Sequence, residues 1–206
     1  MKLDFLQNIF KNKNTAFYKK IPKEVLNELP TKSFEGELYI VSNEEDASFA
    51  VNELKNMPVL GFDTETKPAF KKGVFHNVAL LQLSSKNKAF IFQLKKTGLS
   101  KELADILSDK NIIKTGVAIR DDIKALKKLR NFTPNGFVEL QKYSDDLGIE
   151  DNGLKNLSGN VLGFKISKGA RLTNWDNDKL TENQQKYAAT DAWVSYLIYD
   201  KLSQIN

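Results

Sequence analysis

Acidic side chains recur in three separated segments of the chain, each placed where a strand or a helix could aim them at a common point. Asp63 and Glu65 end one apolar run, and Asp122 follows another. Asp191 lies near the C-terminus, four residues after Tyr187. Carboxylates gathered at one point repel each other and lose hydration, so they stay ionised together only if cations neutralise them. The pattern therefore predicts a two-metal site of the kind that hydrolyses phosphodiesters by in-line displacement at phosphorus.

Asp63 and Glu65 are two residues apart, directly after the apolar residues 59–62. Successive side chains of a strand alternate between its faces, so a strand here would present both carboxylates on one side. Repulsion and lost hydration would raise the pKa of at least one of them unless a cation is present. The alternative is that one acid caps a turn while the other faces water. Taken alone, this pair leaves both interpretations open.

Asp122 stands near the start of a helix predicted over residues 121–129. It shares a helical stripe with Leu126 and Leu129, which places its side chain toward the sheet rather than toward solvent. Asp121 points about a quarter turn away and is predicted to cap the helix. Negative charge at a helix N-terminus is worth about 0.3–1 kcal/mol, so either acid could serve the helix alone. Taken alone, this segment favours a role for the acid in stabilising the helix N-terminus rather than in binding a metal.

Tyr187 and Asp191 lie on one face of the longest predicted helix, residues 182–202, because they are four residues apart. Val194 and Ile198 continue the same stripe, which predicts that this face is buried. No Lys or Arg stands one turn away on the stripe, so a shared metal would supply the missing positive charge. The alternative is an acid at the edge of the stripe that reaches water. An unperturbed phenol has a pKa of about 10, which suits Tyr187 to orient an attacking water rather than to deprotonate it.

Hydrophobic periodicity predicts the strands and helices that must position these side chains. The predicted strands cover residues 37–41, 58–64, 77–84, 88–93 and 112–117, with a further short one at 137–140. The predicted helices cover residues 43–55, 100–107, 121–129, 153–162 and 182–202. Thr181 followed by Gln184 matches a capping box at the start of the last helix. These elements predict an α/β fold with a mixed central β-sheet flanked by α-helices.

Residues 1–35 precede this pattern and are predicted to form a helical extension of a domain at 36–206. Residues 5–10 carry a short apolar stripe at helical spacing. A second short helix is predicted between Pro22, at its first position, and Pro30, beyond its end. Such apolar faces either pack onto the main domain or bind a partner, and packing is the favoured interpretation.

The composition narrows the chemistry. The chain has no cysteine, which excludes disulfides, zinc–thiolate sites and thiol catalysis. Its single histidine, His76, argues against a histidine-built metal site or a Ser–His pair. Any metal would be held by oxygen ligands, which favours Mg²⁺ or Mn²⁺. The net charge of +5 suits a polyanionic partner, and equally an ordinary solvated surface.

The length of 206 residues fits one domain with a modest extension. No run approaches the roughly 20 apolar residues that span a bilayer, so no membrane attachment is expected. The N-terminal residues mix charged with apolar side chains and lack a small-residue cleavage signal, so no signal peptide is predicted. Together with the absence of cysteine, these features favour a cytoplasmic protein of undetermined oligomeric state.

Taken in order, the three acidic segments resemble the DEDDy branch of the DEDD superfamily of 3′–5′ exonucleases. Residues 63–65, Asp-Thr-Glu, are similar to the first motif of that family. Residues 116–122 resemble the second motif, with Ala118 where glycine is common. The spacing of Tyr187 and Asp191 matches the Tyr-x-x-x-Asp form of the third.

The resemblance covers residues 36–206 and extends beyond the acids. Residues 78–83, Val-Ala-Leu-Leu-Gln-Leu, and 173–175, Thr-Asn-Trp, are similar to stretches of Werner-syndrome-type exonuclease domains. Ribonuclease D is a more distant relative. The resemblance implies a ribonuclease H-like fold, two bound divalent ions, Mg²⁺ or Mn²⁺, and release of nucleoside 5′-monophosphates from the 3′-hydroxyl end of DNA or RNA.

The same resemblance assigns metal binding to the four acids Asp63, Glu65, Asp122 and Asp191, with Tyr187 as a further catalytic residue. The implied partner is a nucleic acid that is single-stranded or has an accessible 3′ terminus. Two alternatives stay open. One is a catalytically silent nucleic-acid-binding or adaptor module of the same fold, and the other is a metal-dependent phosphoesterase that acts on free nucleotides.

Basic side chains outside the motifs are candidates for substrate contacts. Lys168 and Arg171 lie in a Gly-containing stretch before Trp175. Arg171 fits the position of a basic residue often seen in the Werner-type domains, where it would contact a phosphate. An exposed basic loop explains both residues as well. Trp175 itself is predicted to be a core anchor rather than a stacking platform.

Phe75 is predicted to lie, with Lys71 and Lys72, in a loop after the first acid pair, where it could guide a 3′ end by stacking. Ordinary surface-loop chemistry explains these residues equally well. Thr64 and Thr66, within the first acidic segment, are further candidates for substrate contacts. The sequence does not decide between DNA and RNA.

Overall fold

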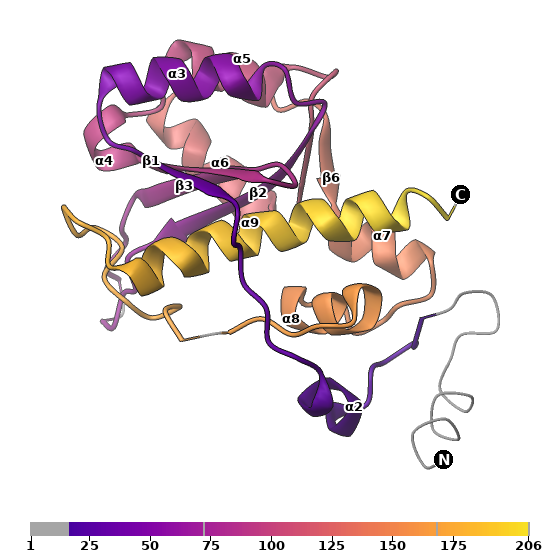
Figure 1. Cartoon of the computed structure of the whole chain (residues 1–206). Coiled ribbons are helices and arrows are strands. Elements are labelled where there is room, and N and C mark those ends of the chain that lie inside the picture. The colour runs from indigo at the N-terminus through magenta and orange to yellow at the C-terminus, as the bar shows by residue number, and fades with distance from the viewer. Residues whose placement is uncertain (1–16, 72, 168, 206) are drawn as a thin grey trace.

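A mixed β-sheet forms the centre of the computed structural model, which describes residues 17–71, 73–167 and 169–205 (Figure 1). In these residues the sheet has six strands in the spatial order β1-β4-β3-β2-β5-β6. Their bounds are β1 Glu37–Val41, β2 Val59–Thr66, β3 Val78–Ser84, β4 Lys88–Gln93, β5 Ile113–Gly116 and β6 Phe137–Glu139. The pairs β2–β3 and β3–β4 are antiparallel and the other neighbours are parallel. The predicted mixed sheet is confirmed, and β2, the strand of the first acid pair, lies inside it.

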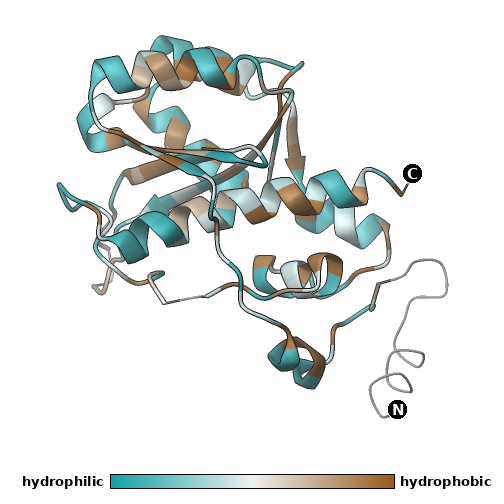
Figure 2. Ribbon diagram, in the orientation of Figure 1, coloured by the Kyte–Doolittle hydropathy of each residue, from teal (hydrophilic) through white to brown (hydrophobic). Residues whose placement is uncertain are grey.

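One face of the sheet is buried beneath α3 (Glu44–Leu54), α5 (Lys101–Ser108) and α6 (Arg120–Leu129). Leu60 and Phe62 of β2 join this core because alternate strand residues point to the same side. Figure 2 shows brown stretches in the strands and teal alternating with brown along the helices that flank them. This core cluster therefore lies on the side of β2 that is opposite to its acids, whereas two further clusters pack around α9.

The long helix α9 (Glu182–Leu202) covers the other face of the sheet, which carries the acids (Figure 1). It begins at the predicted capping box, in which the side chains of Thr181 and Gln184 accept hydrogen bonds from each other's backbone N–H groups. Gly61 lets this helix approach β2 closely, because a Cβ there would lie only 1.8 Å from the carbonyl oxygen of Ala192. The helix is thereby placed directly over the first acidic segment.

Two short helices that were not predicted follow strands β4 and β6 directly, α4 (Leu94–Thr97) and α7 (Leu140–Asp146). The single helix predicted over residues 153–162 is instead α8 (Leu154–Leu157), continued by the π-helical turn η1 (Ser158–Leu162). None of the helices in the described ranges is both long enough and apolar enough to cross a membrane.

Residues 17–35 pack against the rest of the domain through buried side chains and backbone hydrogen bonds. Their helix, α2 (Lys23–Glu28), places Leu26 against Gly159 of η1, where a Cβ would lie 2.3 Å from the leucine side chain. The packing interpretation is thus confirmed for this segment. The apolar stripe at residues 5–10 lies outside the described residues, and the boundary between extension and domain stays a prediction.

Candidate active site

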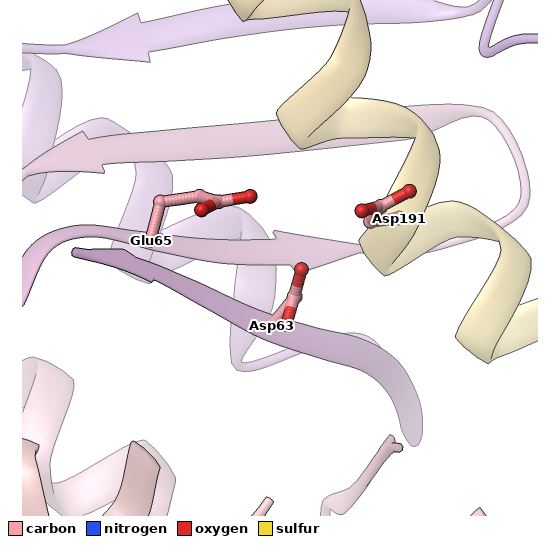
Figure 3. A group of neighbouring side chains, drawn as sticks. All are labelled: Asp63, Glu65 and Asp191. Carbon is pink, nitrogen blue, oxygen red and sulfur yellow. The ribbon is translucent and has the colours of Figure 1, made fainter. Parts of the chain in front are cut away.

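Three carboxylates meet between β2 and α9 (Figure 3). Asp63 and Glu65 extend from the same face of β2, and Asp191 approaches them from α9. One oxygen of each carboxylate lies within 4.8 Å of those of the other two. Strand β2 runs two residues beyond its predicted end, to Thr66, which keeps Glu65 in the strand. The structure thus brings together three of the four acids that the sequence motifs assign.

Burial and mutual repulsion raise the pKa values of these acids. Asp191 is only 7% exposed, and the other two are partly buried. Burial is the largest cause that raises the pKa of Asp63, and the charge of Asp191 comes next. Burial, followed by the charge of Asp191, raises the pKa of Glu65 from 4.5 to about 8. The positive charge of Arg171 lowers the pKa of Glu65 and opposes this shift only in part. The cluster is therefore a site that a cation would stabilise.

Asp122 lies beside the group of three, in the first turn of α6. Its carboxylate accepts a hydrogen bond from the hydroxyl of Thr64, the residue between the two strand acids. Burial raises the pKa of Asp122, and its charge in turn raises the pKa values of Asp63 and Glu65. Thr64, a candidate for substrate contact, is therefore bonded to the fourth acid and ties α6 to β2.

The start of α6 is held by Glu139, a residue that sequence analysis missed. From the end of β6 its carboxylate accepts hydrogen bonds from the N–H groups of Ala118 and Ile119, each at 2.9 Å. Ile119 is the N-cap residue of α6, and its own side chain makes no capping hydrogen bond. The prediction that Asp121 caps the helix is wrong for this reason, and Asp121 instead pairs with Lys124 at 2.8 Å on the surface. Ala118 adopts a left-handed φ of 59° at this turn.

Tyr187 lies one turn before Asp191, and its ring packs against Trp175 with the ring centroids 5.9 Å apart. Burial, followed by the charges of Asp191 and Glu65, raises the pKa of the Tyr187 phenol well above its usual value. A hydrogen bond with Asp191 adds to this shift. The phenol therefore keeps its proton at neutral pH and acts as a hydrogen-bond donor. Trp175 is buried, as predicted for a core anchor.

The candidate substrate contacts lie around the acids rather than among them. Arg171 is exposed, and its influence on the pKa of Glu65 places its guanidinium near the cluster. Thr66 is exposed at the last position of β2. Phe75 is almost fully exposed in the loop between β2 and β3. Lys168 lies outside the described residues.

Gln82 is a second residue that sequence analysis missed. It lies on β3 directly opposite Asp63 in the antiparallel register, so both side chains share the face toward α9. Its side chain is 1% exposed, and neither the nitrogen nor the oxygen of its amide has a hydrogen-bond partner among the described residues. Buried amides are nearly always hydrogen-bonded, so this one indicates a group that the protein does not itself supply. The sequence signal that could have identified Gln82 is a polar residue within an otherwise apolar strand.

The chemistry of these side chains fits hard divalent cations. The donors that converge are carboxylate oxygens, which are the ligands preferred by Mg²⁺ and Mn²⁺. Asp63, Glu65 and Asp191 would hold the ions, with Asp122 beside them. Their raised pKa values are the expected mark of anions placed to share a positive charge.

Comparisons with known proteins agree with this geometry. A family described as 3′-5′ exonuclease matches residues 38–205. The bifunctional 3′-5′ exonuclease/ATP-dependent helicase WRN of Mus musculus is 34% identical over 198 residues, covering 90% of this chain and 14% of that protein. Human exonuclease 3′-5′ domain-containing protein 2 is 32% identical over 160 residues, covering 72% of this chain and 25% of that protein. The chain therefore spans only a minor part of the length of these curated relatives.

A solved structure shares the fold. The EXO domain of Nibbler from Aedes aegypti superposes with a TM-score of 0.76 at 21% identity, covering 85% of this chain and 92% of that one. The ribonuclease H-like arrangement of sheet and helices is thereby confirmed.

Proposed function

The chain belongs to the family of 3′–5′ exonuclease domains, and from that premise we propose that it hydrolyses nucleic acids from an accessible 3′-hydroxyl end. The observation that carries the proposal is the convergence of Asp63, Glu65 and Asp191 within 4.8 Å, from a strand and a helix far apart in sequence. Their raised pKa values support a site built to hold divalent cations. The products would be nucleoside 5′-monophosphates.

In the proposed reaction, a water oxygen bonds to the terminal phosphorus while the bond from phosphorus to the 3′ oxygen of the preceding nucleotide breaks. The water loses a proton, and the departing 3′ oxygen gains one. Two divalent ions held by the acid cluster would activate the water and neutralise charge on the attacking and leaving oxygens. The chain itself supplies the ligands and fixes the direction of attack.

Tyr187 and Arg171 take complementary roles in this proposal. The phenol of Tyr187 keeps its proton and would orient the attacking water by a hydrogen bond. Arg171, exposed near Glu65, pairs with oxygens of the terminal phosphate. Asp122, fixed by Thr64, adds negative charge at the side of the cluster and so favours cation binding.

Gln82 is assigned a positioning role, because its buried amide lies opposite Asp63 and has no hydrogen-bond partner among the described residues. The amide N–H would donate a hydrogen bond to an oxygen of Asp63 and so fix the orientation of that carboxylate toward a bound ion. Gln82→Leu is expected to weaken Mn²⁺ binding by about 10- to 100-fold in a calorimetric titration. Thr115→Val is the matched control, since the Thr115 hydroxyl is also buried and unpartnered but lies opposite Gly61. Equal Mn²⁺ affinity in both variants would contradict the role.

The test of the function is a time course on 5′-labelled single-stranded DNA and RNA of matched sequence, with Mg²⁺, Mn²⁺ or a chelator. A ladder that shortens from the 3′ end, and that is absent with chelator and in Asp63→Ala, is the expected result and also shows which sugar is preferred. Binding without shortening by the folded chain would instead select the catalytically silent module. Degradation of free nucleotides alone would select a phosphoesterase.

A further inference from the structure

Two phenylalanines stand out on the surface of the loop that follows β2. Phe75 is 91% exposed and Phe70 is 84% exposed, more than any other large apolar side chain of the described residues. Both lie in the loop of residues 67–77, in which Lys72 is outside the described residues. The loop leaves the end of β2 directly after the segment that carries Glu65. Rings left in water at this place indicate a surface that is covered when the protein works.

A groove of about 440 Å³ runs beside this loop. Phe75 and His76 line it from the loop, Lys95 from α4 and Leu129 from the last position of α6. Asp176 is the one acid in its lining. The loop, α4 and the end of α6 thus form one concave surface that begins where β2 ends.

Lysines outnumber acids around the groove and its loop. Between Glu65 and Glu102 the sequence contains eight lysines and no acidic residue. Lys67, Lys71 and Lys95 form no salt bridge with any residue in the described part of the chain. The groove and its loop therefore offer unpaired cations together with exposed aromatic rings.

These two features together fit a single-stranded nucleic acid. Phosphates are attracted to the lysines, and unpaired bases stack on aromatic rings with little dependence on sequence. We propose that a single-stranded 3′ tail lies along the loop and the groove, with bases stacked on Phe70 and Phe75 and phosphates near Lys95, before its end enters the acid cluster. This inference rests on the proposed function and specifies its substrate class. A tail of unpaired nucleotides is preferred over a blunt duplex, whose paired bases cannot reach the rings.

Binding tests the inference independently of hydrolysis. The full chain carrying Asp63→Asn is titrated, in Mg²⁺, into a fluorescent single-stranded oligonucleotide. The added double substitution Phe70→Ala and Phe75→Ala is expected to raise the Kd about tenfold or more. Phe49→Ala is the matched control, because Phe49 is 45% exposed on α3, a helix that does not line the groove. Its Kd is expected to stay unchanged.

Neutralising the lysine and neutralising the acid of the groove should change the binding affinity in opposite directions. Lys95→Gln is expected to weaken binding and to lower the slope of log Kd against log salt by about 0.7, the share of one phosphate contact on a single strand. Asp176→Asn is expected to tighten binding, because it removes the acid of the lining. Lys110→Gln, exposed in the turn between α5 and β5, is the control and changes neither quantity.

The outcomes separate this inference from the proposed function. An unchanged Kd in the double phenylalanine variant, with the wild-type chain still shortening oligonucleotides, would overturn the inference and leave the function standing. If binding depends on the two phenylalanines but the wild-type chain does not shorten oligonucleotides, the inferred binding surface stands and the proposed function fails. Vesicles that contain phosphatidylserine supply a third result. If the two phenylalanines are needed for vesicle binding but not for oligonucleotide binding, the loop contacts membranes and the inference fails.

Discussion

Two regions of the same sheet bury charge, and the chain compensates only one of them in full. Lys114 on β5 is fully buried. Its ammonium donates hydrogen bonds to the backbone carbonyls of Ile106, Asp109 and Ile112, at distances between 2.6 and 3.0 Å. The charge also lies over the ring of Phe137, 5.2 Å from its centroid. Each proton of the ammonium group is thus satisfied by the protein itself.

The acids of β2 and α9 are compensated only in part, by the charge of Arg171 near Glu65 and by a hydrogen bond between Tyr187 and Asp191. Burial raises the pKa of Glu65 to about 8, and burial lowers the pKa of Lys114 to about 8. The same cause acts on both, but carbonyl oxygens surround the lysine, whereas further carboxylates face the glutamate. The contrast teaches that burial alone does not identify a binding site for ions. A site is indicated where the chain adds like charges instead of satisfying the first.

The largest expected effect is the loss of catalysis when one acid of the cluster is neutralised. Asp63→Asn should lower kcat for 3′-end hydrolysis by about 10³-fold or more, since residues that act as a unit fail together. Initial rates on a labelled single strand measure the effect, and circular dichroism verifies the fold. Asp121→Asn is the control, because Asp121 is an exposed acid paired only with Lys124, and its kcat should match the wild type.

The second largest expected effect is on stability, and it has opposite signs in the two regions. Lys114→Met should lower the free energy of unfolding by about 3 kcal/mol, because two buried carbonyls and one partly buried carbonyl lose their donor. Asp63→Asn should instead raise the melting temperature in chelator, because it removes a repelled charge. Urea and thermal unfolding measure both. Destabilisation of the protein by both substitutions would mean that the acids, like the lysine, serve the fold.

The two regions also predict opposite pH dependences in chelator. The pKa of Glu65 is raised, so its contribution to stability is full below pH 4.5 and is lost as the pH rises toward 8. The pKa of Lys114 is lowered, so stability increases again as the pH rises from 8 toward 10.5. Melting temperatures should therefore pass through a minimum near pH 8. Glu65→Gln should reduce the fall in melting temperature on the acidic side of this minimum. Saturating Mn²⁺ should raise the melting temperature at the minimum.

The smallest expected effect concerns the backbone beside the cluster. Ala118 adopts a positive φ of 59°, which costs a residue with a Cβ about 1 kcal/mol or more. Ala118→Gly should therefore increase stability by about 1 kcal/mol in urea unfolding. Ala125→Gly, in the interior of α6, is the control with the opposite sign and should cost about 0.5–1 kcal/mol. Destabilisation by both would show that position 118 is not strained.

Periodic patterns predicted most of the fold, because they depend on residues near each other in sequence. Strands β1 and β4 and helix α9 have the predicted bounds, and the capping box of α9 is present. The alternation of side chains along β2 and the one-turn spacing in α9 also predicted which acids would face each other. Short helices such as α4 and α7 carry too few residues for a period to show.

The remaining features depend on contacts between elements, which one sequence does not encode in any local pattern. Gln82 faces Asp63 only through the register of β2 with β3. Glu139 takes the place of a helix cap because β6 ends beside the start of α6. The hydrogen bond from Thr64 that fixes Asp122 likewise joins two elements. Such residues are found from structure, whereas the acids themselves were found from spacing.

The close approach at Gly61 has a consequence for the choice of ion. With a Cβ only 1.8 Å from the Ala192 carbonyl, any larger residue there would push α9 away from β2 by roughly 1 Å or more. The gap between Asp191 and the two strand acids would widen by a similar amount. Mg²⁺ binds oxygen at about 2.0–2.1 Å and Ca²⁺ at about 2.3–2.6 Å, so a widening of that size would change which ion the three acids could hold. A single hydrogen atom in place of a methyl group thus sets the distance between α9 and the acids of β2.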